Sequence, residues 1–227
     1  MKTQLSCYLC GKPATTWDHI PPKSLFPKSY QGKGYKLPAC QNCNNQTSKD
    51  DEYLRDCLAI TGQNSDARTV FTETVRRGYM RDYEASRGFP KHKRILADTF
   101  DVGMRMPDGD LLKRVLAMKM NAARLSGSFE KVIRGLYYQS FDRQIPSGYS
   151  FTVYYQPPTI LTELIEKARA KNALKAGMFG DTFSYMGTVT GEDQFVGIWW
   201  LSFYQTHGVI VVVDSPERLI MGGRDEH

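Results

Sequence analysis

Two pairs of cysteines constrain this chain of 227 residues more than any other feature of its sequence. Each pair has the spacing C-x2-C, with Cys7 and Cys10 in the first pair and Cys40 and Cys43 in the second. Two such knuckles, separated by a few tens of residues, are the usual framework of a tetrahedral site in which four thiolates bind one zinc ion. Because four protein ligands leave no position for water, we expect a structural zinc that helps to fold the N-terminal segment.

Two other interpretations of the cysteines are open, namely a pair of disulfides and a redox-active C-x-x-C site. Disulfides require an oxidising compartment, and the first ten residues lack the apolar region of a secretory signal, which predicts a cytoplasmic location. Redox sites normally use one pair of cysteines, whereas this chain has two. The fifth cysteine, Cys57, is expected to be a buried free thiol.

The composition and the charge distribution limit the class of protein. Hydrophobic residues make up 41% of the chain and charged residues 24%, which argues against a disordered chain. No apolar run reaches the ~18 residues of a membrane helix, so we expect no membrane partner. Net charges are +3 for residues 1–58, +6 for 59–145 and −3 for 146–227. The positive net charge of residues 1–145 indicates a surface that binds a polyanion, although ordinary scatter of surface charge explains it equally well.

The segments beside the cysteines carry a more specific pattern. Residues 15–20 are expected to form a short strand that ends at Pro21-Pro22, and a helix is expected to begin directly after the second knuckle. The sequence Asp18-His19-Ile20-Pro21, followed by C-x2-C-Asn, resembles the HNH endonuclease family in its zinc-stapled variant, which has the ββα-metal fold. The resemblance covers about residues 5–56, and residues 60–227 resemble no family that we recognise.

This resemblance implies a metal-dependent endonuclease that hydrolyses DNA phosphodiester bonds, with RNA as an alternative substrate. His19 would be the general base, because an imidazole titrates near neutral pH. Asp18 and Asn44 would hold a catalytic Mg²⁺ or Mn²⁺ ion through hard oxygen ligands, which favour Mg²⁺ over a softer transition metal. By analogy, a small free-standing HNH protein would serve in restriction or phage defence.

Two features depart from a simple match to the family. Adjacent residues on a regular strand face opposite sides, so Asp18 and His19 can meet one phosphate only if the strand bends. The family's middle Asn has no counterpart between His19 and Asn42. We therefore expect a backbone carbonyl, or a residue of the loop 29–35, to brace the base.

Each candidate residue of the site also has an ordinary structural interpretation. His19 could pack or cap, Asp18 could accept hydrogen bonds from backbone amides at the turn, and Asn44 could cap the helix while Asn45 serves as the ligand. The acidic run at residues 50–52 is expected to be a solvated helix face near the positive helix terminus, not a further set of ligands.

Basic residues interleaved with aromatic residues follow the motif, a combination that suits a nucleic-acid backbone. A solvated helix face with some core aromatics explains the same pattern equally well. Lys23, in the loop after His19, is a further candidate for a phosphate contact. The candidates for nucleic-acid binding are thus Lys23, Arg76, Arg77, Arg81, Lys91, Lys93 and Arg94.

The whole chain is predicted to be α+β, with an HNH nuclease module at 1–58, a basic helical region at 59–145 and an α+β domain at 146–227. The last region could mediate self-association or protein contacts. Helices are expected at 65–87, 108–125, 128–141 and 159–176, and strands at 149–156, 182–190, 194–204 and 208–213.

Two further functions compete with the endonuclease. The first is a catalytically inactive, zinc-containing nucleic-acid-binding protein, which the missing middle Asn favours. The second is a protein–protein adaptor in which zinc only stabilises the fold.

Overall fold

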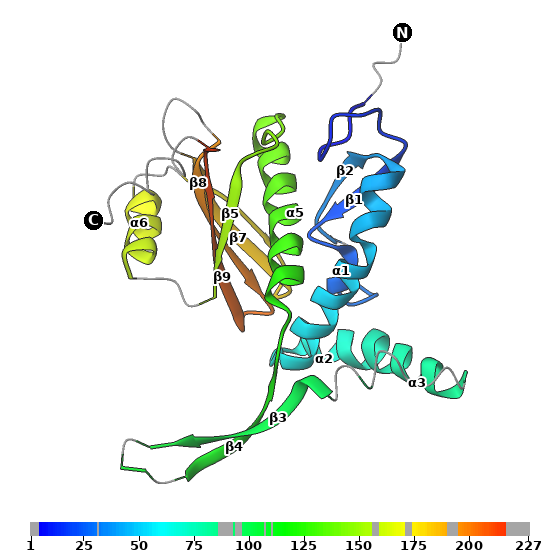
Figure 1. Cartoon of the computed structure of the whole chain (residues 1–227), viewed down its shortest axis with the longest axis vertical. Helices are drawn as coiled ribbons and strands as arrows, with labels where there is room; N and C mark the ends of the chain where they lie inside the picture. Colours follow the sequence, from blue (N-terminus) through cyan, green and yellow to red (C-terminus); the bar gives the residue numbers. More distant parts are fainter. Residues whose placement is uncertain are drawn as a thin grey trace.

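A long helix, α5 (Ala122–Phe141), lies between a five-stranded antiparallel sheet and an N-terminal module (Figure 1). This computed structural model describes residues 5–30, 32–85, 93, 97–106, 108–109, 111–155, 159–170, 174–189 and 195–216. The predicted α+β class is confirmed. Within those residues, no helix combines the length and apolarity that crossing a bilayer requires.

The N-terminal module is a β-hairpin followed by a helix. Strands β1 (Thr16–Ile20) and β2 (Tyr35–Ala39) pair antiparallel, and the loop between them contains a short 3₁₀ turn, η1 (Lys23–Leu25). Helix α1 (Gln41–Thr61) begins inside the second knuckle, with Cys40 as its N-cap and Cys43 in its first turn. The strand expected before Pro21-Pro22 is confirmed, and so is the helix at the second knuckle, although it begins before Cys43 and not after it.

A second helical stretch follows α1. It consists of α2 (Ser65–Val70), a π-helical turn η2 (Phe71–Val75) and α3 (Arg76–Glu84), which confirms the predicted helix over most of its length. The stretch turns away from the sheet, and α3 projects from the body of the molecule (Figure 1).

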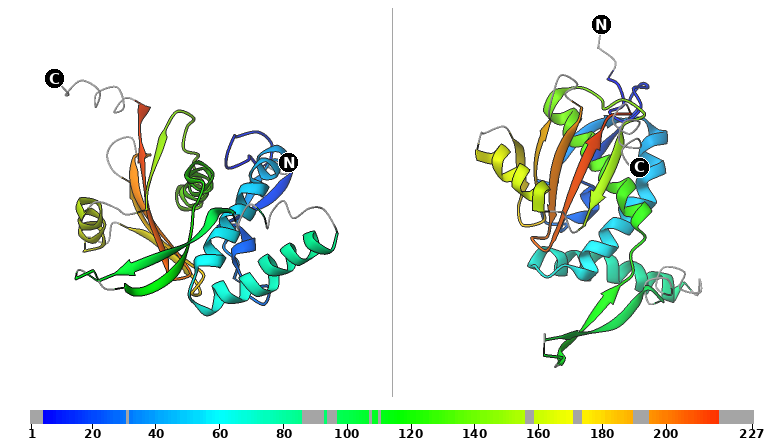
Figure 2. Two further views of the ribbon diagram at one scale, coloured as in Figure 1. Left: turned by 60° about the horizontal axis from the view of Figure 1, so that its bottom comes forward. Right: turned by 60° about the vertical axis from the view of Figure 1, so that its left-hand side comes forward.

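The helix expected over residues 108–125 is wrong, because most of that segment is strand. Strands β3 (Thr99–Arg105) and β4 (Leu111–Met118) form an antiparallel ribbon that extends beyond the body of the molecule (Figures 1 and 2). The apolar residues of β4 fit a helical spacing, but Asp108-Gly109 is also a hairpin signal, and Gly109 has φ +95°. Pairing with β3 decides the outcome, and only the end of the predicted segment joins α5.

The C-terminal sheet has the strand order β5-β9-β8-β7-β6. The strands expected from residue 149 onward are confirmed, whereas the predicted helix ends at Ala170 and an unpredicted edge strand follows. Helix α6 covers the face of the sheet opposite α5 (Figure 2). The elements are β5 (Ser150–Tyr154), α6 (Thr159–Ala170), β6 (Lys175–Phe179), β7 (Phe183–Val189), β8 (Gly197–Phe203) and β9 (His207–Asp214).

Helix α5 is buried on both sides, which joins the module to the sheet. Its residue Gly135 lies so close to Ile20 of β1 that an added Cβ would come within 2.4 Å of the Ile20 side chain. On the sheet side, Trp199 is fully buried while its neighbour Trp200 is partly exposed on the other face, as the alternation of a strand requires. Tyr204 also donates a buried hydrogen bond to the Leu25 carbonyl, at 2.6 Å.

Candidate functional site

The four knuckle cysteines converge as their spacing predicts. The four Sγ atoms all lie within 4.8 Å of one another, and the Sγ atoms of Cys10 and Cys40 are 3.7 Å apart. Four thiolates around zinc, with Zn–S distances of about 2.3 Å, form a tetrahedron whose edges are about 3.8 Å. The donor set and its dimensions therefore fit a metal ion such as zinc. Cys57 is buried and lies outside this cluster.

Local backbone geometry favours the thiolate of Cys40, whereas burial raises the pKa of Cys43 in the same knuckle. Cys40 is the N-cap residue of α1, and its Sγ accepts a hydrogen bond from the Cys43 N–H at 3.4 Å. This hydrogen bond is the main cause that lowers the pKa of Cys40 to about 7. Because the thiolate is the form that binds metal, Cys40 is partly ready to bind zinc at neutral pH.

The first knuckle is tied to the hairpin through Tyr8, which lies between its two cysteines. The Tyr8 N–H donates to the Pro38 carbonyl of β2 at 2.9 Å, and the buried Tyr8 hydroxyl donates to Asp18 Oδ2 at 2.9 Å. The metal cluster and β1 are therefore linked through one side chain. A displacement of the first knuckle would therefore alter the hydrogen bond between Tyr8 and Asp18.

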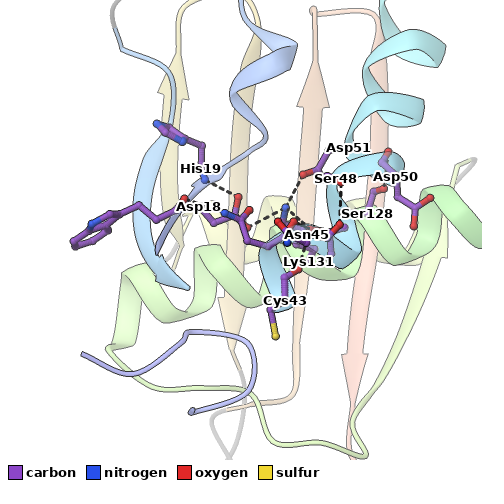
Figure 3. A network of polar contacts seen from close by, with 12 residues as sticks. Asp18, His19, Cys43, Asn45, Ser48, Asp50, Asp51, Ser128 and Lys131 are labelled. Atoms are coloured by element: carbon purple, nitrogen blue, oxygen red, sulfur yellow. Dashed lines mark hydrogen bonds and ion pairs between the residues drawn. The ribbon is translucent and has the colours of Figure 1, made fainter. Parts of the chain in front are cut away.

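Asp18 and His19 face opposite sides of β1, so the strand does not bend to bring them together. Asp18 is buried beneath the hairpin, whereas His19 is partly exposed. Figure 3 shows the His19 imidazole directed away from the Asp18 carboxylate and its partners. The direct link between the two residues is local, since the His19 backbone N–H donates to Asp18 Oδ1 at 2.8 Å.

Asp18 belongs to a buried ionic cluster centred on Lys131 of α5. The Lys131 ammonium lies 3.0 Å from Asp18 Oδ2, 2.7 Å from Asp51 Oδ2 and 3.0 Å from Thr47 Oγ1 (Figure 3). The Lys131 side chain is 3% exposed. One ammonium group thus faces two carboxylates and holds β1, α1 and α5 together.

Asp51 differs from the solvated helix face expected for residues 50–52. Its Oδ1 atom is buried and has no hydrogen-bond partner among the described residues. Burial raises the pKa of Asp51, and the neighbouring Lys131 ammonium partly offsets that rise. Asp50 and Glu52 fit the expectation better, because they pair with Arg124 and Arg55 nearer the surface.

His19 lies in a basic environment. Partial burial is the largest cause that lowers the pKa of His19 below its ordinary value; the positive charges of Lys23, Lys36 and Lys33 lower it further, and the negative charge of Asp18 partly offsets them. Lys36 is the residue opposite His19 on β2. At neutral pH the imidazole is therefore mainly neutral, and the nearby charge that acts on it is mostly positive.

The two asparagines after Cys43 have different surroundings. The Asn44 amide nitrogen donates to the Trp17 carbonyl at 3.3 Å, which brings the side chain of Asn44 to the backbone of β1 beside Asp18. Asn45 is exposed, and its side-chain oxygen accepts from Gln41 at 3.4 Å. Asn44 is thus the asparagine that adjoins the predicted site.

In this arrangement both oxygens of the Asp18 carboxylate already have partners. Asp18 is almost completely buried, one carboxylate oxygen accepts from the Tyr8 hydroxyl and faces the Lys131 ammonium, and the other accepts a backbone N–H. A divalent cation would have to replace the Lys131 ammonium at that carboxylate. The role of Asp18 and Asn44 as cation ligands therefore stays a prediction.

The candidates for nucleic-acid contact fall in two places. Lys23 is exposed in η1 close to His19, and α3 carries Arg76, Arg77 and Arg81, all exposed. Arg77 and Arg81 line an open groove of about 430 Å³ together with Lys28 from the β1–β2 loop, although Glu73 and Glu84 also border it. Of the remaining candidates, Lys93 is exposed, while Lys91 and Arg94 lie outside the described residues.

The contribution of α5 to this region was not predicted from the sequence. Lys131 lies three residues after Ser128 and four before Gly135, among apolar residues at helical spacing. A lone lysine on the small-residue part of an apolar helix face was the available signal, because such a lysine needs a buried acidic partner. Nothing local to residue 131 identifies Asp18 and Asp51 as those partners.

No protein-family model, no curated protein and no solved structure matches this chain. The function must therefore be argued from its own residues.

Proposed function

We propose that this chain is an endonuclease that hydrolyses nucleic-acid phosphodiester bonds, with His19 as the general base. One observation carries the proposal: a partly exposed histidine lies on the outer face of a β-hairpin, among three lysines, and the four-cysteine cluster fixes that hairpin. The hairpin–helix order of the N-terminal module and the Asp18-His19 pair also support it, because both are features of the HNH family that the sequence resembles.

The arrangement suits the first half of phosphodiester hydrolysis. A neutral His19 can accept a proton from a water molecule as the water oxygen forms a bond to phosphorus; the bond to the leaving oxygen breaks, and that oxygen takes a proton from solvent water. The ammonium groups of Lys23, Lys33 and Lys36 would attract the phosphate and offset the charge that develops on its oxygens. The buried cluster around Lys131 would hold β1 rigid during the reaction.

The family resemblance implies that Mg²⁺ or Mn²⁺ assists the reaction by stabilising negative charge on the phosphate. Because Asp18 is already paired with Lys131, no step of the proposed reaction is assigned to such an ion. The plasmid assay that tests His19 as the base also measures whether cleavage depends on added Mg²⁺ or Mn²⁺.

The test of the proposal is cleavage of a supercoiled plasmid, with and without Mg²⁺ or Mn²⁺. His19→Ala should slow cleavage by roughly 100- to 10,000-fold, because removal of a general base has effects of that size. The variant should keep its zinc and its melting temperature, since the imidazole is directed away from the buried cluster. His207→Ala is the control for loss of a histidine: it lies on β9, where its ring contacts Thr61 at the C-terminal end of α1, and the folded variant should cut at the wild-type rate. Equal cleavage by wild type and His19→Ala would refute the assignment of the base.

A binding protein without catalysis is the second candidate. The pairing of Asp18 with Lys131 favours it, because this carboxylate has an internal cation as its partner. In that case neither wild type nor His19→Ala would cut the plasmid, while both would retard it equally on a gel.

The basic groove beside α3 gives a prediction that applies to both candidates. Arg77→Ala and Arg81→Ala should each weaken DNA binding without regard to sequence, and each should reduce the slope of log Kd against log salt concentration by about 1. Arg169→Ala on α6, an exposed arginine across the sheet, should change neither quantity. Salt titrations followed by fluorescence anisotropy measure both. An unchanged slope for Arg77→Ala and Arg81→Ala would remove this groove from the nucleic-acid interface.

A further inference from the structure

Trp17 is unusual among the tryptophans of this chain, because it lies at the surface. Its exposed fraction is 47%, whereas Trp199 is fully buried. It lies on the outer face of β1, two residues before His19, while Asp18 between them is buried. At about 3.3 Å per residue, the two outward residues are separated by about 6–7 Å along the strand.

Trp17 makes one contact through its side chain and one through its backbone. The Lys36 ammonium lies 5.4 Å from the centre of the Trp17 ring, as a diagonal neighbour across the hairpin. The Trp17 carbonyl accepts the hydrogen bond from Asn44 that ties β1 to the first turn of α1. The backbone of β1 is thus tied to α1 at Trp17, and the indole, restrained by Lys36 and 47% exposed, is available for stacking.

The charges around Trp17 indicate what would stack on it. Lys36 lies against its ring and opposite His19, and Lys23 is exposed in η1, four residues after His19. Asp18, the acidic residue of the strand, faces the interior. A basic surface with an exposed indole suits a partner with phosphates and flat rings better than an apolar or acidic protein surface.

We propose that an unpaired base of the nucleic acid stacks on Trp17, next to the phosphodiester at which His19 acts as the general base. This inference rests on the proposed function and specifies its substrate class: nucleic acid with unstacked bases, such as a single strand, a gap or a flap. In a continuous duplex both faces of each base are already stacked, so the indole would gain little from a paired substrate.

The test compares binding to two nucleic-acid probes in a variant that lacks the proposed base and so does not cleave them. In the His19→Ala variant, binding to a fluorescein-labelled oligothymidylate and to a blunt duplex of equal length is measured by anisotropy. Adding Trp17→Ala should weaken single-strand binding by roughly 5- to 150-fold, the range expected for loss of one base–aromatic stack. Duplex binding should change by less than about twofold, and Trp17→Phe should recover most of the single-strand affinity.

The matched control is Phe100→Ala, since Phe100 is an aromatic residue on another strand with a similar exposed fraction of 52%. It should leave both affinities unchanged, and thermal unfolding should show that each variant is folded. Single-strand binding that does not respond to Trp17→Ala would overturn the proposed stacking on Trp17, whether or not the wild type cuts plasmid. Equal losses on both probes would overturn the preference for unpaired bases. Failure of the parent to bind either probe, together with no cleavage by wild type, would overturn the proposed function as well.

Discussion

Replacement of Cys40 by serine should abolish metal binding and unfold the N-terminal module. Cys40 supplies one of the four converging sulfurs and also caps α1, so the substitution removes a ligand and alters a helix terminus. Structural zinc contributes about 10–16 kcal/mol in zinc-finger peptides at pH 7, which exceeds what a hairpin and one knuckle can recover by packing. Hydrogen exchange should show lost protection at β1, β2 and the start of α1.

The metal content gives the same prediction a second readout. Elemental analysis of the wild type should find about one zinc per chain, and Cys40→Ser should contain much less. Cys57→Ala is the matched control, because Cys57 is buried on α1 but lies outside the cluster. It should keep its zinc while losing a small amount of stability. If the amides of the N-terminal module stay fully protected from hydrogen exchange in zinc-free Cys40→Ser, then the cysteine cluster is not needed for the module to fold.

Replacement of Lys131 by methionine should destabilise the protein by about 3–5 kcal/mol, because the variant leaves two buried carboxylates without their shared cation. Urea unfolding monitored by circular dichroism measures the loss. The destabilisation should shrink as the pH falls. The pKa of Asp51 is raised in the folded state, so protonation favours that state and removes charge that Lys131 otherwise balances.

Lys167→Met on α6 is the control for this substitution, because Lys167 is an exposed lysine on the opposite face of the sheet. It should change the free energy of unfolding by no more than about 0.5 kcal/mol. If Lys131→Met unfolds at the same urea concentration as wild type at pH 7, then the ionic cluster does not join α5 to the module.

Local patterns account for the parts of the structure that the sequence predicted. The knuckle spacing determines which sulfurs converge, and Pro21-Pro22 determines where β1 ends. The alternation in β1 also places Asp18 and His19 on opposite faces, a difficulty that was visible in the sequence. The end of β1 and its alternation depend on adjacent residues, and the convergence of the sulfurs depends on a repeated C-x2-C pattern that is visible at both knuckles.

The parts that were not predicted depend on partners distant in the chain. The β4 segment was compatible with a helix or a strand, and only its ladder with β3 selects the strand. Asp18 was predicted to bind a metal because its neighbours in sequence suit one, yet its nearest cation is Lys131, more than a hundred residues away. The position of α5 against β1 requires Gly135 beside Ile20, a contact that no local spacing encodes.

Chemical rescue tests the central claim most directly. His19→Gly leaves a space on the outer face of β1, and added imidazole can occupy it as a free base. The account predicts that plasmid cleavage by this variant, measured at constant ionic strength and constant Mg²⁺, rises with imidazole concentration towards the wild-type rate. It also predicts that imidazole does not accelerate the wild type. If cleavage by His19→Gly equals that of wild type without imidazole, or does not respond to imidazole at any concentration, then His19 is not the base.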